Sequence, residues 1–234
     1  MNVSELALVQ GMDDTRAALR RWHAMPFAVL RPWAFGAAAI SVALLLAVWV
    51  ISHIVTPDPT GYLIPGLDEP GTVGAVGHVL FRNSLVLALH AMACVAGFIA
   101  GSSLPLQAEH HDGWWRTVHE KAGPAAIVFV AGATTFSLCT QAYVLGNEAA
   151  TLSQQLEIGR ATLMLTLLPH ALPELVALFL PLAAWMLASR REAWNELLAA
   201  TLVTTALAAP VLVLAANVEV FVWPRLLRLA SPVM

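Results

Sequence analysis

Five long apolar stretches, separated by short polar segments, dominate the pattern of this 234-residue chain. We expect helices over about residues 33–56, 82–104, 124–146, 161–189 and 197–223. About 20 apolar residues, at 1.5 Å each, cross a hydrocarbon core of about 30 Å. The segment TPDPTGYLIPG is rich in proline and glycine and cannot continue the first helix. The pattern therefore predicts an all-α fold, a polytopic transmembrane helical bundle of five spans.

The remaining parts of the chain are short. Residues 1–32 are expected to form a cytoplasmic or interfacial segment, in which residues 4–23 form either an amphipathic helix on the membrane or a solvated lead-in. Residues 33–224 are expected to form the bundle, and residues 225–234 a C-terminal tail. No connecting segment is long enough to bury a core of its own, so we expect one domain.

Composition agrees with the membrane class, because 59% of the residues are apolar and only 12% are charged. The net charge of −3 is divided among the loops, so nucleic acid is not expected as a partner, whereas the lipid bilayer is. The excess of arginine and lysine on alternate loops favours a cytoplasmic N-terminus. Cys94 and Cys139 fall within predicted spans and are interpreted as buried free thiols.

Candidate chemistry comes from ionisable residues inside apolar runs, where they are costly unless they face a partner or a cavity. His90 lies in SLVLALHAMACVAGFIAG, and His170 and Glu174 lie in LMLTLLPHALPELVALFLPLAAW. Counted from Arg82 and Ala161, the two histidines lie roughly 12 to 14 Å along their helices, which predicts a shared level. Glu174 follows His170 by four positions and therefore lies on the same helical face.

Further polar residues are expected on the same side of the bundle. On the second span, one narrow face carries polar and small residues: Asn83, His90, Cys94, Gly97 and Gly101. Its GxxxG pair permits close helix packing, so the face that carries His90 is also expected to pack. Asn147 and Glu148 end the third span on this side, and Glu219 lies near it on the fifth. We expect a polar cavity lined by Arg82, Asn83, His90, His170, Glu174 and Glu219.

Three interpretations of this cavity remain open. In the first, His90, His170 and Glu174 bind a zinc-like metal that keeps an open position for a reactive water. In the second, the same groups line a path or pocket for a proton, a peptide or a lipid. In the third, they form interhelical hydrogen bonds that set the helix register, each contributing on the order of 0.6 kcal/mol.

Three segments also carry a family resemblance. FRNSLVLALHAMACVAGFIAG, PHALPELVALFLP and VLVLAANVEVFVWP resemble, in this order, conserved spans of the stage II sporulation protein M family of bacterial membrane proteins. The similarity covers about residues 78–224. The resemblance carries over to Asn83, His170, Glu174 and Glu219, whereas His90 has no counterpart in the family pattern. Ala171 stands where a glycine commonly follows the histidine, and Pro173 precedes the glutamate.

The resemblance implies a multi-pass protein of the bacterial cell membrane. The resemblance also implies that the protein acts with partner proteins in envelope remodelling or, as in a branch encoded with circular bacteriocins, in peptide maturation. A hydrophobic peptide is then the expected substrate, and a homo-oligomer or partner membrane proteins are expected. If the protein is an enzyme, Glu174 is the expected general base, and the histidines hold a metal or polarise a carbonyl. The alternative is a non-enzymatic scaffold or transporter subunit.

Overall fold

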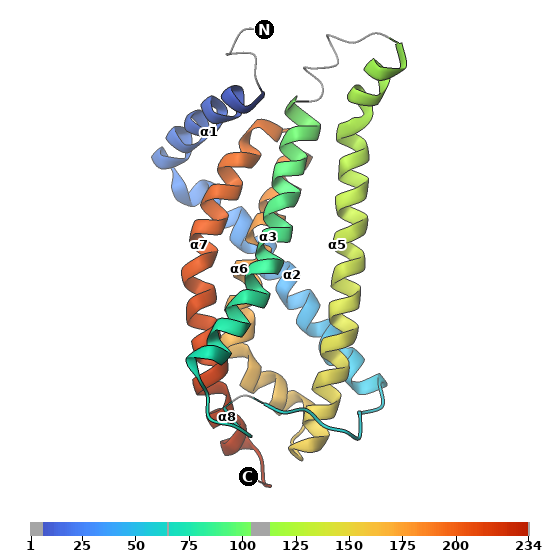
Figure 1. Ribbon diagram of the computed structural model, residues 1–234, viewed down its shortest axis with the longest axis vertical. Helices are drawn as coiled ribbons and strands as arrows, with labels where there is room; N and C mark the ends of the chain where they lie inside the picture. The colour runs from blue at the N-terminus through green and yellow to red at the C-terminus, as the bar shows by residue number, and fades with distance from the viewer. Residues whose placement is uncertain (1–6, 65, 104–112, 234) are drawn as a thin grey trace. The chain divides into compact units, whose positions relative to one another are not determined.

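A computed structural model describes residues 7–64, 66–103 and 113–233, and it is helical without strands over these ranges (Figure 1). Its α-helices are α1 (Ala7–Ala24), α2 (Pro26–Ile54), α3 (Val73–Phe98), α5 (Gly113–Gln155), α6 (Arg160–Arg190), α7 (Leu197–Asn217) and α8 (Trp223–Ala230). Shorter turns are the π-helical η2 (Ile99–Ser103) and η4 (Val218–Val222) and the 3₁₀ turn η3 (Trp194–Glu196). Five helical segments are long and apolar enough to cross a membrane. The all-α prediction and the number of spans are confirmed, and the chain is a multi-pass membrane protein.

Several helices begin earlier than the hydropathy pattern predicted. α3 starts at Val73 rather than near Arg82, because the Thr72 hydroxyl caps it by accepting a hydrogen bond from the Ala75 amide at 3.1 Å. Its first turns are held by a small core in which Val76 packs with Val220 and its neighbours. Helix formation depends on capping and packing as well as on hydropathy, so polar residues such as Arg82 do not end it.

Three other boundaries also differ from the prediction. α2 begins at Pro26 rather than near Trp33, and proline is well tolerated as a first helical residue because its missing N–H would be unpaired there. Pro124 was expected to begin the third span, but it lies inside α5, which starts at Gly113. The predicted C-terminal tail also contains most of α8, which continues to Ala230.

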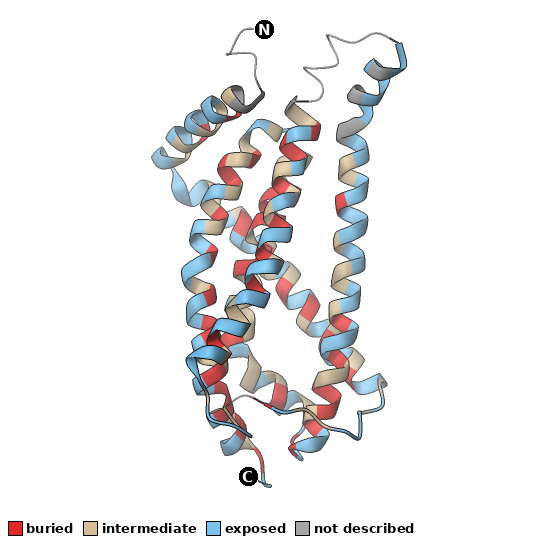
Figure 2. Ribbon diagram, in the orientation of Figure 1, coloured by how far each residue is buried: buried red, intermediate tan, exposed pale blue. Residues whose placement is uncertain are grey.

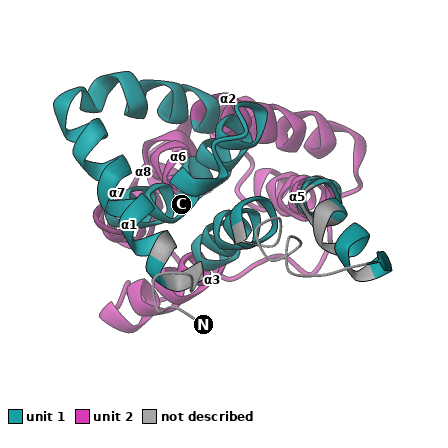
Figure 3. Cartoon of the chain, turned by 90° about the horizontal axis from the view of Figure 1, so that it is seen from above, with its two compact units in different colours: residues 1–37, 86–134, 178–208 teal, residues 38–85, 135–177, 209–234 magenta. Residues whose placement is uncertain are grey.

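The chain forms two compact units, which we describe separately (Figure 3). Unit 1 contains residues 1–37, 86–134 and 178–208, and unit 2 contains residues 38–85, 135–177 and 209–234. Each of the five long helical segments contributes residues to both units.

In unit 1, α1 is attached to the ends of the membrane helices. Gly11 of α1 lies so close to Phe98 and Leu198 that a Cβ atom would come within 2.8 and 2.9 Å of them. Ala18, two turns further on, is fully buried. Residues 7–24 are therefore helical, as one of the two expectations for the N-terminal segment required, and the helix is held by protein contacts.

The small-residue face of α3 packs in unit 1 as its sequence predicted. The Cys94 thiol donates to the Pro181 carbonyl at 3.2 Å and is fully buried. A Cβ atom on Gly97 would lie 2.8 Å from the Trp185 indole nitrogen, and one on Gly101 would overlap the Trp194 ring. The glycine pair thus admits two large indole side chains against the helix backbone.

In unit 2, the segment between α2 and α3 is tied to the end of α5. The Asp58 amide donates to the Thr151 hydroxyl at 2.8 Å. The Gln155 side chain binds both backbone groups of Tyr62, accepting from its amide at 2.8 Å and donating to its carbonyl at 2.9 Å. The described residues of this segment form no helix, and these bonds attach them to the end of α5.

Burial differs strongly between the long helices (Figure 2). In the most apolar 18-residue stretch of α6, half of the residues are buried, whereas in the most apolar 18-residue stretch of α5 only 11% are buried. Phe129 and Phe136 of α5 are each 75% exposed. Apolar side chains exposed along a membrane-crossing helix fit contact with lipid tails or with another membrane helix.

Candidate functional site

Four charged side chains from four helical elements come together in unit 2. Arg82 of α3 interacts electrostatically with Glu148 of α5, Glu174 of α6 and Glu219 of η4. Glu174 also interacts with Glu219 and with the side chain of Asn83. We call these five residues, Arg82, Asn83, Glu148, Glu174 and Glu219, the Arg82 cluster. The structure thus brings together four of the six residues that were predicted to line a cavity.

The burial of the cluster is uneven. Asn83 is 9% exposed, whereas Glu174 and Glu219 are half-buried and Arg82 is exposed. Asn83 Nδ2 and Glu174 Oε2 are both inaccessible atoms that make no hydrogen bond of ordinary geometry in the described part of the chain, although the two side chains interact with each other. Buried polar atoms are nearly always paired in folded proteins, so this donor and this acceptor are candidates for binding a ligand.

Glu219 lies in an unusual turn of the backbone. η4 is a π-helical insertion between α7 and α8, and such insertions occur frequently at functional sites. The loop between α2 and α3 packs directly on η4. Its Gly66, with a φ of +86°, lies so close to the Val220 carbonyl oxygen that a Cβ atom would come within 2.5 Å. The π-helical turn and its contact with Gly66 together fix the position of the Glu219 backbone.

His170 is buried one helical turn from Glu174. It is 5% exposed, and its ring centroid lies 5.3 Å from that of Trp223. Its Nδ1 atom has no hydrogen-bond partner among the described residues. The spacing of four residues gives His170 and Glu174 one helical face, as predicted. His170 is thus next to the Arg82 cluster along α6, with an aromatic ring as its neighbour.

His90 belongs to unit 1 and lies in a different environment. It is 5% exposed and its ring packs edge to face on Phe179, with 5.4 Å between ring centroids. The prediction that His90 and His170 share a level was counted from Arg82, but α3 begins nine residues earlier, at Val73. That count therefore no longer supports a common depth.

The proposed zinc ligands receive no support from the structure. Across residues 7–64, 66–103 and 113–233, no group of three or more histidine, cysteine, aspartate or glutamate residues is arranged to hold a metal ion. His90 is in unit 1, whereas His170 and Glu174 are in unit 2. The assignment of these three residues as ligands stays a prediction from sequence alone.

Glu148 belongs to the Arg82 cluster, but it was not among the six residues predicted to line the cavity. It was expected on the same side of the membrane, but only as a residue ending the third span. α5 continues past it to Gln155, so Glu148 is a helical residue that interacts with Arg82. One feature of the sequence could have indicated this: Glu148 and Thr151 are three residues apart, a spacing that puts two polar side chains on one face of a helix that continues.

The chemistry available to the Arg82 cluster follows from its charges. Three carboxyl groups interact electrostatically with one guanidinium group, in surroundings that are partly shielded from water, so the carboxyl groups outnumber the cationic group. Such a site favours a cationic group, and its carboxylates can also accept hydrogen bonds or a proton.

Comparison with known proteins gives no relative: no protein family, no curated protein and no solved structure matches this chain. The resemblance to stage II sporulation protein M therefore remains an expectation from its three segments.

Proposed function

We propose that this multi-pass membrane protein binds the cationic group of a hydrophobic peptide at the Arg82 cluster, as part of peptide maturation or envelope remodelling in a bacterial membrane. The observation that carries the proposal is that Glu148, Glu174 and Glu219, from three helical elements, all interact electrostatically with Arg82. Like charges repel one another strongly where water is scarce, and a bound cation relieves that repulsion.

Asn83 is the residue that leads us to propose a peptide as the ligand. Its buried Nδ2 donor interacts with the Glu174 carboxyl group but makes no hydrogen bond of ordinary geometry, so it can bind a carbonyl oxygen instead. A free amino terminus bound by Glu174 and Glu219 would bring such a carbonyl within reach. If chemistry follows binding, Glu174 is the favoured general base, because its Oε2 atom has no hydrogen-bond partner, and His170 is the group next to it on α6.

Binding of a model peptide tests this function. The full-length protein in lipid nanodiscs is titrated with a fluorescent apolar peptide that has a free amino terminus, and with its N-acetylated twin. We expect the free amine to bind more tightly and Glu174→Gln or Glu219→Gln to weaken it by about tenfold, the effect of about 1.4 kcal/mol. Glu69→Gln, an exposed loop carboxylate in the same unit, is the matched control.

Equal binding of the two peptides to the wild-type protein would overturn the proposal. Unchanged binding by folded Glu174→Gln and Glu219→Gln proteins would do so as well. Thermal unfolding of each variant separates a local loss of binding from a loss of structure.

A second candidate is a non-enzymatic scaffold or transporter subunit that works with partner membrane proteins or as a homo-oligomer. The exposed apolar face of α5 favours it, because Val128, Phe129 and Phe136 are each at least 74% exposed. Cysteine crosslinking in membranes at Phe136, compared with the buried neighbour Val130, measures whether another chain lies against this face.

A further inference from the structure

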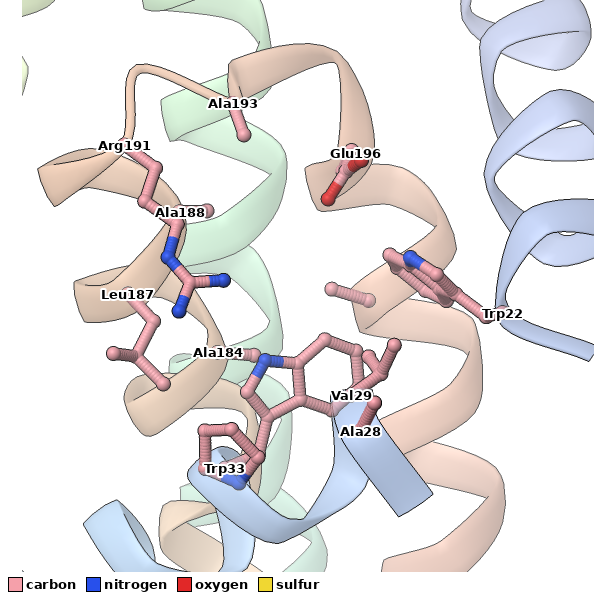
Figure 4. Close-up of a pocket in the computed structure, with 12 residues that line it drawn as sticks. Trp22, Ala28, Val29, Trp33, Ala184, Leu187, Ala188, Arg191, Ala193 and Glu196 are labelled. Carbon is pink, nitrogen blue, oxygen red and sulfur yellow. The ribbon is translucent and has the colours of Figure 1, made fainter. Parts of the chain in front are cut away.

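A cavity of about 90 Å³ opens within unit 1, where the end of α6 and the start of α7 meet the region between α1 and α2 (Figure 4). Aromatic and charged side chains line it, including Trp22, Trp33, Arg191 and Glu196. Figure 4 shows the Arg191 side chain extending from the end of α6 into this cavity, toward Trp33. We call this space the Arg191 cavity.

The two charges in the Arg191 cavity are not equivalent. Glu196 Oε1 accepts a charged hydrogen bond from Arg21 Nη2 at 2.8 Å, which neutralises the carboxylate and joins α1 to η3. The Arg191 side chain makes no hydrogen bond or ion pair within the described part of the chain. The uncompensated charge is therefore the guanidinium of Arg191.

A second, apolar space adjoins the first. It has a volume of about 320 Å³ and shares Trp22 and Val29 with the Arg191 cavity. Its other lining residues are Leu19, His23, Pro26, Leu30 and Val203. Val203 lies six residues into α7, about 9 Å along the helix from its first residue. This apolar groove thus reaches from the polar end of the helices toward the middle of a membrane span.

We propose that the Arg191 cavity and the apolar groove together bind one anionic phospholipid. The phosphate is placed at the Arg191 guanidinium, whose planar set of donors matches phosphate oxygens. An acyl chain lies in the groove beside Trp22, a residue type enriched where membranes meet water. Basic pockets between membrane helices on the cytoplasmic side are typical sites for anionic head groups.

The surroundings favour a lipid over free phosphate. The groove provides apolar surface that inorganic phosphate cannot use, whereas burying each CH₂ group of an acyl chain is favourable. The bound phospholipid would fasten α1 and α2 to α6 and α7.

Native mass spectrometry of the delipidated full-length protein tests the proposal. The probes are phosphatidylglycerol and phosphatidylcholine with identical acyl chains, and inorganic phosphate as a competitor. We expect Arg191→Gln to weaken retention of the first phosphatidylglycerol molecule by about tenfold, without a comparable effect on phosphatidylcholine. Arg190→Gln is the matched control, because Arg190 is the neighbouring arginine and is not among the residues that line the cavity.

A second pair of variants tests the groove. Val203→Trp fills it and should reduce phosphatidylglycerol binding, whereas Leu202→Trp, at a position 57% exposed, should not. Equal phosphatidylglycerol binding by Arg191→Gln and Arg190→Gln would overturn the proposal. Displacement of the lipid by millimolar inorganic phosphate would overturn the role given to the acyl chain. Peptide binding at the Arg82 cluster is measured separately, so the two proposals succeed or fail independently.

Discussion

The imidazole ring of His170 packs against the indole ring of Trp223, with 5.3 Å between ring centroids and 51° between their planes. The same indole donates its Nε1–H to the Thr166 hydroxyl, one turn before His170, at 3.3 Å. Trp223 therefore contacts α6 at two successive turns. Because Glu219 precedes it by four residues, this contact also positions the turn that carries a member of the Arg82 cluster.

Shortening Trp223 should separate these two contacts. Trp223→Phe keeps an aromatic ring beside His170 but removes the hydrogen bond, so we expect a loss of about 1 kcal/mol in the free energy of unfolding. Trp223→Ala also loses the packing of a buried indole and should cost about 3–5 kcal/mol. Denaturant unfolding in detergent measures both values. A Phe variant as unstable as the Ala variant would show that the hydrogen bond dominates.

Gly66→Ala should destabilise the contact between η4 and the loop that joins α2 to α3. Alanine is disfavoured at a φ of +86°, and its Cβ atom would overlap the Val220 carbonyl oxygen, so we expect at least about 2 kcal/mol of destabilisation. Gly77→Ala is the control, because its Cβ atom would meet nothing within 4 Å inside α3. That change should stabilise the helix by about 0.5–1 kcal/mol. The expected order of melting temperatures is therefore Gly77→Ala above wild type and Gly66→Ala below it.

Arg228 should hold the loop onto α8. Its Nη2 atom donates to the carbonyl oxygens of Gly66 and Leu67, at 3.0 and 3.2 Å. Arg228→Gln removes these bonds at an exposed position, so we expect about 0.5–1 kcal/mol of local destabilisation and a few-fold faster amide exchange in the loop. Arg225→Gln, also exposed on α8, is the control. Identical exchange in both variants would contradict the role of Arg228.

Asp58 should make the loop sensitive to acid. The Thr60 amide and hydroxyl both donate to its carboxylate, at 2.8 and 2.7 Å, and lower the pKa of Asp58 below its ordinary value of 3.8. Since the folded-state pKa lies below the unfolded value, the stabilisation is present above pH 3.8 and disappears as the pH falls through the folded-state pKa. Thr60→Ala should raise the pKa and Thr60→Ser should restore it, as measured by carboxyl-carbon NMR. Equal pKa values in the three proteins would exclude the hydroxyl as a cause.

Metal analysis separates the remaining interpretations of the histidines. Because the described residues contain no group of three or more histidine, cysteine, aspartate or glutamate residues that could hold a metal ion, we expect far less than one zinc ion per purified chain. Addition of a chelator should leave the melting temperature unchanged. Stoichiometric zinc that is lost in both His90→Ala and His170→Ala proteins would restore the metal interpretation.

The candidate site was partly predictable from sequence. Glu174 and His170 were identified because ionisable residues in apolar runs are costly, and their spacing of four placed them on one face. The membership of Glu148 was missed, because the third span was expected to end there. The grouping of His90 with His170 stays a prediction, and its depth was counted from the edge of an apolar run rather than from the Thr72 cap.

The sequence by itself determined the membrane class, the five spans, the packing face of α3 and the residues worth testing. These features depend on side-chain hydropathy and on helical periodicity, which are local properties. Only the tertiary structure decided that Arg82 meets three glutamates from different helices, and that Arg191 opens toward an apolar groove. These contacts depend on how each helix is rotated about its axis, on where it begins and ends, and on the loop that packs against η4. All three are set by packing between residues that are far apart in the chain.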